Sequence, residues 1–531
     1  MSEAGSEKVT GEGAEALPVV SRRRTATINF AFHCVGLSVV LAHGILLVPL
    51  YLTKIPVSVY GAWLATGNVL AWIELVDPGL STVLQQRVSF LYGSGNRAEM
   101  GRAIGTGIAL NIPICLMPLL GLPLAAHLGS WVHLEAASST ILAQSFRLGL
   151  VGTALSLAAY AFTAINIGLH RAITQGMVFA AAGVAGLIGT LVMLLSGIGL
   201  PSLPLGLIIR ASILLLGNAL PILTWSAKHL SGQVTASMTE ARSILGLLSF
   251  SFASRLGATL ADRADAFLSA TLFGPGITAI LALSARPYEP VKLLGTRSAL
   301  SLMPAVAHLS GEGKVEKIRS VVSRLASVTG LATGIAMGCM VGLNSIFVSL
   351  WAGPRFFGGQ PLNVLIALGA AGYVFSNVLS TVVYALGGIK QTSALALGEG
   401  VVRVGLQYLL GRRYGLIGIP AGAFLSSALL GMWAYPSISA RLLGTRPSHQ
   451  LRIWLANWLW VFGAILVGSL VSAILSALHL TWTWPSFMVA AVLLGTTLSV
   501  AGVLSSSDLR AYIRSLYLRF RAARSGAVAP P

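Results

Sequence analysis

Long apolar runs recur through this chain from Phe30 almost to its carboxyl end, and each is long enough to cross a lipid bilayer. Hydrophobic residues make up 55% of the 531 residues, and charged residues only 10%. A soluble chain carries about 25% charged residues. The pattern predicts an all-α polytopic membrane protein.

Fourteen apolar segments are expected to span the membrane, with short connections between them. Their approximate ranges are 30–52, 58–82, 103–125, 142–168, 176–199, 203–226, 243–272, 277–308, 321–351, 361–387, 393–411, 415–438, 453–478 and 486–505.

Two loops indicate that the chain repeats. Gly93 and Gly95 follow the second span, and Gly311 and Gly313 follow the eighth at an offset of 218 residues. Transporters are often built from two such halves with the substrate site between them. We therefore expect two six-helix lobes plus two additional helices. The predicted parts are a disordered amino terminus (1–27), two lobes (28–242 and 243–440), spans 13 and 14 (441–505) and a basic amphipathic tail (506–531).

The formal net charge is +19, and its distribution indicates topology rather than nucleic-acid binding. Most Lys and Arg residues fall in the amino terminus, the even-numbered loops and the carboxyl terminus. Basic residues favour the cytoplasmic side of a membrane, so both termini are expected there. The tail from Ser507 to Arg521 has a basic helical face suited to lying on anionic membrane lipids.

Charged residues concentrate inside two neighbouring apolar spans. An ionised group at bilayer depth costs about 2.5–3.5 kcal/mol on insertion scales, so it needs a partner or a wet cavity. The eight residues are Arg255, Asp262, Arg263 and Asp265 in span 7, and Arg286, Glu289, Lys292 and Arg297 in span 8.

Span 8 combines basic residues with Pro287 and Pro290, which bend a helix and free its carbonyls. Arg286 and Glu289 are spaced i, i+3 and can pair, which leaves a basic surplus that suits an anion. The predicted substrate-binding residues are Arg255, Arg286, Lys292 and Arg297. The alternative is a structural ion-pair network that locks span 7 to its neighbours.

The remaining buried charges are predicted to form ion pairs or to carry a coupling ion. Glu399 and Arg403 have the i, i+4 spacing of a self-satisfied pair. Glu74 corresponds to Lys292 at the repeat offset, so it either pairs with Lys292 across the halves or takes up a proton. The full set is Glu74, Asp77, Asp262, Asp265, Glu289, Glu399 and Arg403.

The sequence lacks a P-loop, a nucleophile elbow and metal-ligand histidine spacing. We therefore expect no catalytic residue, no metal site and no cofactor, and we expect a transporter rather than an enzyme.

Three short motifs resemble the start of polysaccharide and O-antigen flippases. They are Leu47-Val48-Pro49-Leu50-Tyr51-Leu52, Tyr60-Gly61-Ala62-Trp63 and Asp77-Pro78-Gly79-Leu80, followed by the Gly-x-Gly loop. The likeness covers roughly residues 28–440. The superfamily also holds multidrug and toxic-compound exporters and lipid II flippases.

The resemblance implies a V-shaped bundle that alternates between inward-open and outward-open states in a bacterial cytoplasmic membrane. The implied substrate is an oligosaccharide linked through pyrophosphate to a polyprenyl lipid, with a proton or sodium as coupling ion. The implied protein partners are a polysaccharide polymerase and glycosyltransferases. No nucleic-acid partner is expected. A lipid II flippase, an ion-coupled multidrug exporter and a membrane polysaccharide polymerase or ligase remain alternatives.

Overall fold

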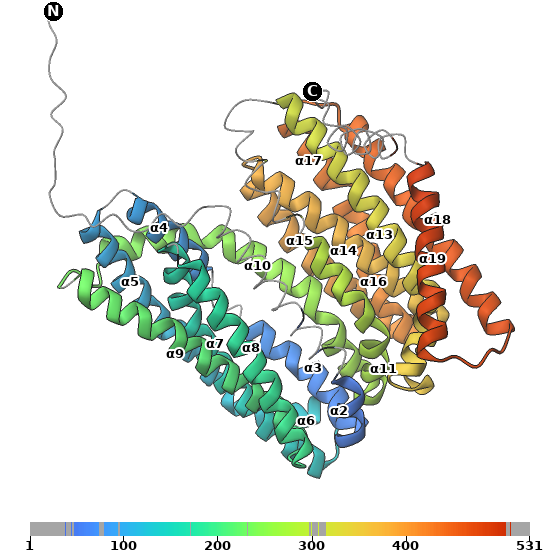
Figure 1. The fold of residues 1–531 in the computed structure, drawn as a ribbon, viewed down its shortest axis with the longest axis horizontal. Coiled ribbons are helices and arrows are strands. Elements are labelled where there is room, and N and C mark those ends of the chain that lie inside the picture. The colour runs from blue at the N-terminus through green and yellow to red at the C-terminus, as the bar shows by residue number, and fades with distance from the viewer. Residues whose placement is uncertain are drawn as a thin grey trace, which may run out of the picture.

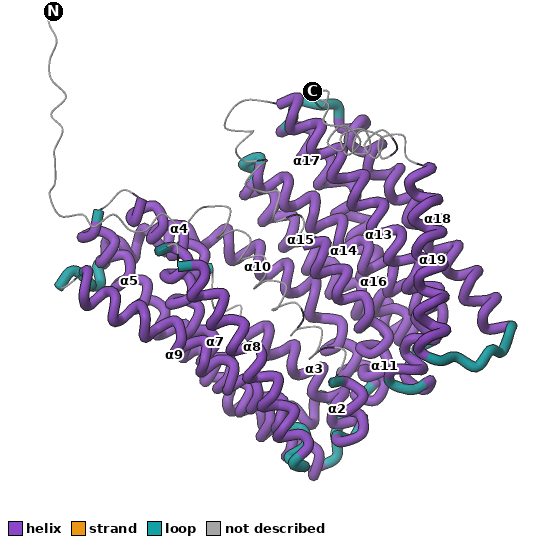
Figure 2. The backbone as a smooth tube through the Cα atoms, viewed as in Figure 1, coloured by secondary structure: helices purple, strands orange, loops and turns teal. Residues whose placement is uncertain are grey.

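The computed structural model describes residues 38, 44, 47–73, 79–93, 96–169, 171–230, 232–296, 299, 306, 315–505 and 510. Within these ranges the chain is almost entirely helical, with short loops (Figure 2). Most of the expected first span lies outside the described residues. Glu74, Asp77, Arg297 and nearly all of the basic tail also lie outside them.

The helices of the amino-terminal half are α2 (Val48–Lys54), α3 (Val57–Ile73), α4 (Leu80–Gly93), α5 (Arg97–Leu116), α6 (Leu128–Trp131), α7 (Ala136–Gly168), α8 (Ala172–Leu195) and α9 (Ser202–His229). The helices of the carboxyl-terminal half are α10 (Met238–Phe273), α11 (Pro275–Ala285), α13 (Val315–Trp351), α14 (Gln360–Ala385), α15 (Ile389–Tyr414), α16 (Gly418–Ser426), α17 (Met432–Leu442), α18 (Pro447–Ala477) and α19 (Trp484–Ser505).

Nine of the described helical stretches are long and apolar enough to cross a membrane. One of them, Ile389–Leu442, has 54 residues and contains the packed pair α15 and α16, so it is long enough to cross twice. Two further predicted spans depart from this simple pattern: α10 carries several charges, and α11 stops after 11 residues. These departures coincide with the charged spans, and the fold is that of a multi-pass α-helical membrane protein.

The helices form two pseudo-symmetric lobes in a V (Figure 1). Helices α4 to α9 build one arm, which we call the N-lobe. Helices α11 to α19 build the other arm, the C-lobe, with α18 and α19 on its outer side. The arms converge near α2, α6 and α11 and diverge toward α4, α5 and α17.

The repeat offset reappears in the helix boundaries. Adding 218 to Val57, the first residue of α3, gives Pro275, the first residue of α11. The same shift takes Arg97, where α5 begins, to Val315, where α13 begins. Corresponding helices therefore start at corresponding positions, as expected for duplicated halves.

The converging end is held by close packing between α3 and α11. A Cβ atom built on Gly61 would lie 1.9 Å from the carbonyl oxygen of Pro275, so only glycine allows this approach. A buried apolar cluster surrounds the contact and draws on both halves of the chain, with Tyr60 on one side and Leu283 and Trp351 on the other. The cluster joins the arms where they meet.

Helix α10 belongs to both lobes. At its first turn Glu240 accepts two hydrogen bonds from Arg87 of α4, at 2.8 and 3.2 Å. Farther along, Gly257 packs against Ala396 and Gly400 of α15, with no room for a Cβ atom on either glycine. The helix thus crosses from the N-lobe at its start to the C-lobe at its end (Figure 1).

Candidate functional site

A polar cavity of about 150 Å³ lies where α3 faces the C-lobe, among α10, α11, α14, α15 and α16. Leu64 lines it from α3, and the other lining residues come from the carboxyl-terminal half. Its charged lining residues are Asp262, Arg263, Asp265, Arg286, Glu289, Lys292 and Arg403. Seven ionisable groups around one cavity at membrane depth mark it as the candidate site.

Span 8, in which Pro287 and Pro290 are predicted to bend the helix and free its carbonyls, has a break in its α-helix at Pro287. Helix α11 ends at Ala285, and residues Arg286–Tyr288 form a 3₁₀ turn before the chain is helical again from 289 to 296. Proline cannot donate a backbone hydrogen bond, so the regular ladder stops at Pro287. The turn places Arg286, Glu289 and Lys292 at the cavity wall.

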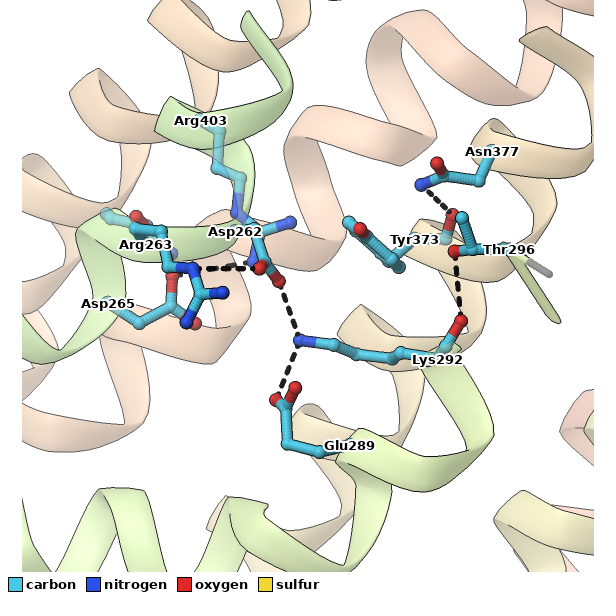
Figure 3. A network of polar contacts seen from close by, with 10 residues as sticks. Asp262, Arg263, Asp265, Glu289, Lys292, Thr296, Tyr373, Asn377 and Arg403 are labelled. Carbon is cyan, nitrogen blue, oxygen red and sulfur yellow. Dashed lines mark hydrogen bonds and ion pairs between the residues drawn. The ribbon is translucent and has the colours of Figure 1, made fainter. Parts of the chain in front are cut away.

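Lys292 lies at the centre of an ion-pair network (Figure 3). Its Nζ atom is 3.0 Å from Asp262 Oδ1 and 2.9 Å from Glu289 Oε1. It also lies 5.0 Å from the centre of the Tyr373 ring, a cation–π contact. Because the side chain is only 15% exposed, the two carboxylates compensate its charge in this state.

This network corrects two details of the sequence prediction. Glu289 pairs with Lys292 rather than with Arg286, although both spacings are i, i+3. The second acid that pairs with Lys292 comes from span 7: Asp262 contacts Lys292 and also lies 3.2 Å from Arg263. The basic surplus of span 8 is therefore smaller than its own sequence indicates.

Arg286 reaches toward the amino-terminal half of the chain. Its Nε atom donates a 2.7 Å hydrogen bond to the carbonyl of Gly44. A Cβ atom at Gly44 would lie 2.6 Å from Nη2 of Arg286, so the guanidinium occupies the space that a side chain would fill. Arg286 both lines the cavity and links the two halves.

A second polar group lies on the α15 side of the cavity. Arg403 is 3.4 Å from Asp265 of α10, and Gln407 donates a 2.7 Å hydrogen bond to the same carboxylate oxygen. Glu399 instead accepts hydrogen bonds from Ser376 and Ser427. The predicted self-satisfied Glu399–Arg403 pair is therefore wrong: these residues take partners on other helices.

Of the four predicted substrate-binding residues, the structure brings Arg286 and Lys292 to one cavity. Arg255 lies on α10, two helical turns before Asp262, outside the set that lines the cavity. Arg297 lies outside the described residues, as do Glu74 and Asp77, so the proposed Glu74–Lys292 pairing stays a prediction.

Sequence reasoning missed the uncharged polar residues around the site. Tyr373 stacks near Lys292, and Ser427 begins a π-helical turn, Ser427–Gly431, beside Glu399. Asn344 and Asn363 form buried hydrogen bonds behind the break in span 8. An isolated Asn in an apolar run was the available signal. Within the described ranges, no group of three His, Cys, Asp or Glu residues could hold a metal ion.

No family model and no curated protein matches this sequence. Solved structures do match its fold. The lipid II flippase MurJ in an inward closed conformation has a TM-score of 0.63 at 15% identity, covering 92% of this chain and 100% of that chain.

Two MATE transporters are also similar. An inward-facing MATE family transporter of the MOP superfamily has a TM-score of 0.58 at 16% identity and covers 78% of this chain and 98% of that one. A point mutant of the Vibrio cholerae MATE transporter VcmN has a TM-score of 0.54 at 16% identity, covering 80% of this chain and 98% of that one. The chain therefore has the fold shared by MurJ and the MATE transporters.

Proposed function

We propose that this protein is a flippase that moves an oligosaccharide, linked through pyrophosphate to a polyprenyl lipid, across a bacterial cytoplasmic membrane. The observation that carries the proposal is the charged cavity where the lobes face each other, with Arg286 extended from the C-lobe to Gly44. A cation at the junction of two moving lobes is placed to meet an anionic group and to respond to it.

The extent of the structural likeness supports a lipid-linked substrate over a drug. The MurJ structure matches 92% of this chain, whereas the two MATE structures described above match 78% and 80%. The two additional helices, α18 and α19, account for a comparable share of the chain. A lipid II flippase is the second candidate, since MurJ is similar over its whole length.

The alternating-access cycle would open and close the diverging end of the V. Under the predicted topology that end, which carries the α4–α5 and α17–α18 connections, faces the cytoplasm. In the other state Lys292 would exchange Asp262 and Glu289 for the substrate or for Glu74. Either exchange would free a carboxylate to take up a proton or sodium. A polymerase and glycosyltransferases would act on the same lipid-linked glycan.

Reconstituted vesicles test the substrate directly. A fluorescent polyprenyl-pyrophosphate oligosaccharide should cross the bilayer with the wild-type protein, and Arg286→Ala should abolish crossing. Arg413→Ala is the matched control, because Arg413 is an exposed arginine in the last turn of α15. Arg286→Lys should retain part of the rate if charge suffices, and none if a bidentate guanidinium is needed.

Three outcomes separate the candidates. Transport of the polyprenyl oligosaccharide but not of lipid II supports the main proposal, and the reverse supports the lipid II flippase. Transport of a cationic dye with neither lipid would favour the drug exporter. Full rates in the Arg286→Ala, Lys292→Ala double variant would remove the assigned pyrophosphate site.

A further inference from the structure

Behind the break in span 8 lies a buried hydrogen-bond network without any charged group. The Tyr288 hydroxyl donates to Asn363 Oδ1 at 2.7 Å, and Asn344 Nδ2 donates to the same oxygen at 2.8 Å. Asn344 Nδ2 also donates to the carbonyl of Ser284 at 2.9 Å. All four residues are at most 1% exposed, so each bond is shielded from water.

The network holds both flanks of Arg286. Ser284 lies two residues before it and Tyr288 two residues after it, and both are bound to α13 or α14. The Ser284 hydroxyl is fixed as well, since it donates to Phe356 O at 3.1 Å and accepts from Gly358 N at 3.0 Å. Ser284 and Tyr288 are four residues apart and share one face of the segment, so Arg286, midway between them, points away from that face.

The anchored segment lacks one of the backbone hydrogen bonds that a regular turn would have. In a 3₁₀ turn the N–H of residue 287 would donate to the carbonyl of Ser284, but Pro287 has no N–H. Asn344 supplies the missing donor to that carbonyl. Asn363 is itself held by donating to Val341 O at 3.3 Å and to Gln360 Oε1 at 3.3 Å.

We propose that Asn344, Asn363 and Tyr288 are positioning residues that fix the proline break and thereby set the direction in which Arg286 points. Tyr288 also lines the cavity, but none of these hydrogen bonds involves the cavity's ion-pair network, so the three residues act through Arg286. The consequence for transport rests on the proposed function, whereas the effect on the direction of Arg286 does not.

Local electrostatics at Ala285 report the direction of Arg286 without any substrate. Ala285 lines the cavity and is adjacent to Arg286. In a protein whose Cys34, Cys115 and Cys339 are replaced by alanine, Ala285→Cys is modified by anionic and cationic thiosulfonate reagents of similar size. The introduced thiol should react faster with the anionic reagent, and Arg286→Gln in the same background defines the loss of that preference.

Tyr288→Phe removes a single hydroxyl and keeps the ring. It and Asn344→Ala should each lower the anionic-to-cationic rate ratio about threefold, the effect of moving one charge away by several ångströms in a wet cavity. Neither should lower the ratio further when Arg286→Gln is already present. The matched control is Asn166→Ala in the N-lobe, where Asn166 and Asn218 are both fully buried and bonded at 2.9 Å.

The control should lose thermal stability to a similar degree but keep the wild-type ratio. An unchanged ratio in both Tyr288→Phe and Asn344→Ala would overturn the proposal, because the network would then only stabilise the fold. A lowered ratio with normal glycolipid transport would uphold the positioning role and contradict the substrate contact of Arg286. A lowered ratio together with lost glycolipid transport would support both the positioning role and the substrate contact of Arg286.

Discussion

The two lobes share a helix plan but use buried polar groups differently. In the described part of the N-lobe, Asn111, Asn166 and Asn218 bond to backbone carbonyls or to each other within the α-helices α5, α7 and α9. In the C-lobe, Asp262, Lys292 and their neighbours form ion pairs around a broken helix. Within the described residues, the two lobes share a helix plan, and the ion-pair network lies on the C-lobe side of it.

The difference shows what a helix break adds. At the repeat offset, Arg286 corresponds to Asn68 and Glu289 to Ala71, and Pro287 and Pro290 to Val69 and Trp72, so the counterpart segment of the amino-terminal half lacks these two charges and both prolines and keeps a charge at Glu74. A continuous helix satisfies its own backbone, whereas a broken one needs neighbours to do so. The C-lobe meets that need with Asn344, and it can hold charges where the break leaves room for them.

The largest expected effect is a loss of stability when the central cation is removed from the C-lobe. Lys292→Gln leaves Asp262, whose side chain is only 21% exposed, with Arg263 as its remaining cationic contact, and breaking a largely buried pair costs about 3 kcal/mol. Adding Asp262→Asn should recover part of the loss. The melting temperature in detergent measures both, and an additive second loss would contradict the pairing.

The second largest loss of stability is expected at the junction between the lobes. Gly61→Ala places a Cβ atom 1.9 Å from the Pro275 carbonyl oxygen, so α3 and α11 must separate, at a cost of about 1–3 kcal/mol. Gly276→Ala is the control one residue along α11, where an added Cβ atom meets nothing within 4 Å. Equal melting temperatures for the two variants would show that the close approach does not matter.

A smaller effect is expected at the diverging end. The Arg87–Glu240 pair is partly exposed, with side-chain exposures of 34% and 14%, so its coupling energy should be about 0.5–1 kcal/mol. A double-mutant cycle of Arg87→Gln and Glu240→Gln measures it, and raising the salt concentration should reduce it. A coupling energy larger than that of the Asp262–Lys292 pair would contradict the expectation that the less exposed ion pair contributes more to stability.

The smallest effect is predicted for Arg210, an arginine inside a predicted membrane span of the N-lobe. Arg210 lies half-buried with its guanidinium 5.7 Å from the centre of the Phe179 ring. Arg210→Met keeps the apolar stem, so stability should change by no more than about 0.5 kcal/mol. Transport should also persist, and its loss would place a functional cation in the N-lobe.

Much of the fold could be predicted from the sequence because apolar length is a strong signal. The expected span at 203–226 corresponds to α9 (Ser202–His229), and that at 361–387 to α14. The proline break was also foreseeable, since Pro287 lacks a backbone donor whatever surrounds it. These features depend on local composition alone.

Ion-pair partners were less predictable. The i, i+3 rule allowed Glu289 to pair with either Arg286 or Lys292, and the break rotates Arg286 toward Gly44. For Glu399, the serines at 376 and 427 come from helices whose facing surfaces no single-chain pattern reveals. Helical spacing shows which residues share a face, but not which neighbouring helix covers that face.

Helix α10 has a mechanical consequence for the whole molecule. Its 36 residues extend about 54 Å, and its two halves are held by different lobes. Its second half packs on α15 through Gly257 and Gly400, whereas its first half is held to α4 by an apolar cluster of Leu80, Ile244 and Leu248 and by the partly exposed Arg87–Glu240 ion pair. Any movement of the two arms relative to each other must bend α10 or separate it from one of these contacts. Of these contacts the ion pair is the one that salt screens, so under the proposed cycle the transport rate should depend on ionic strength.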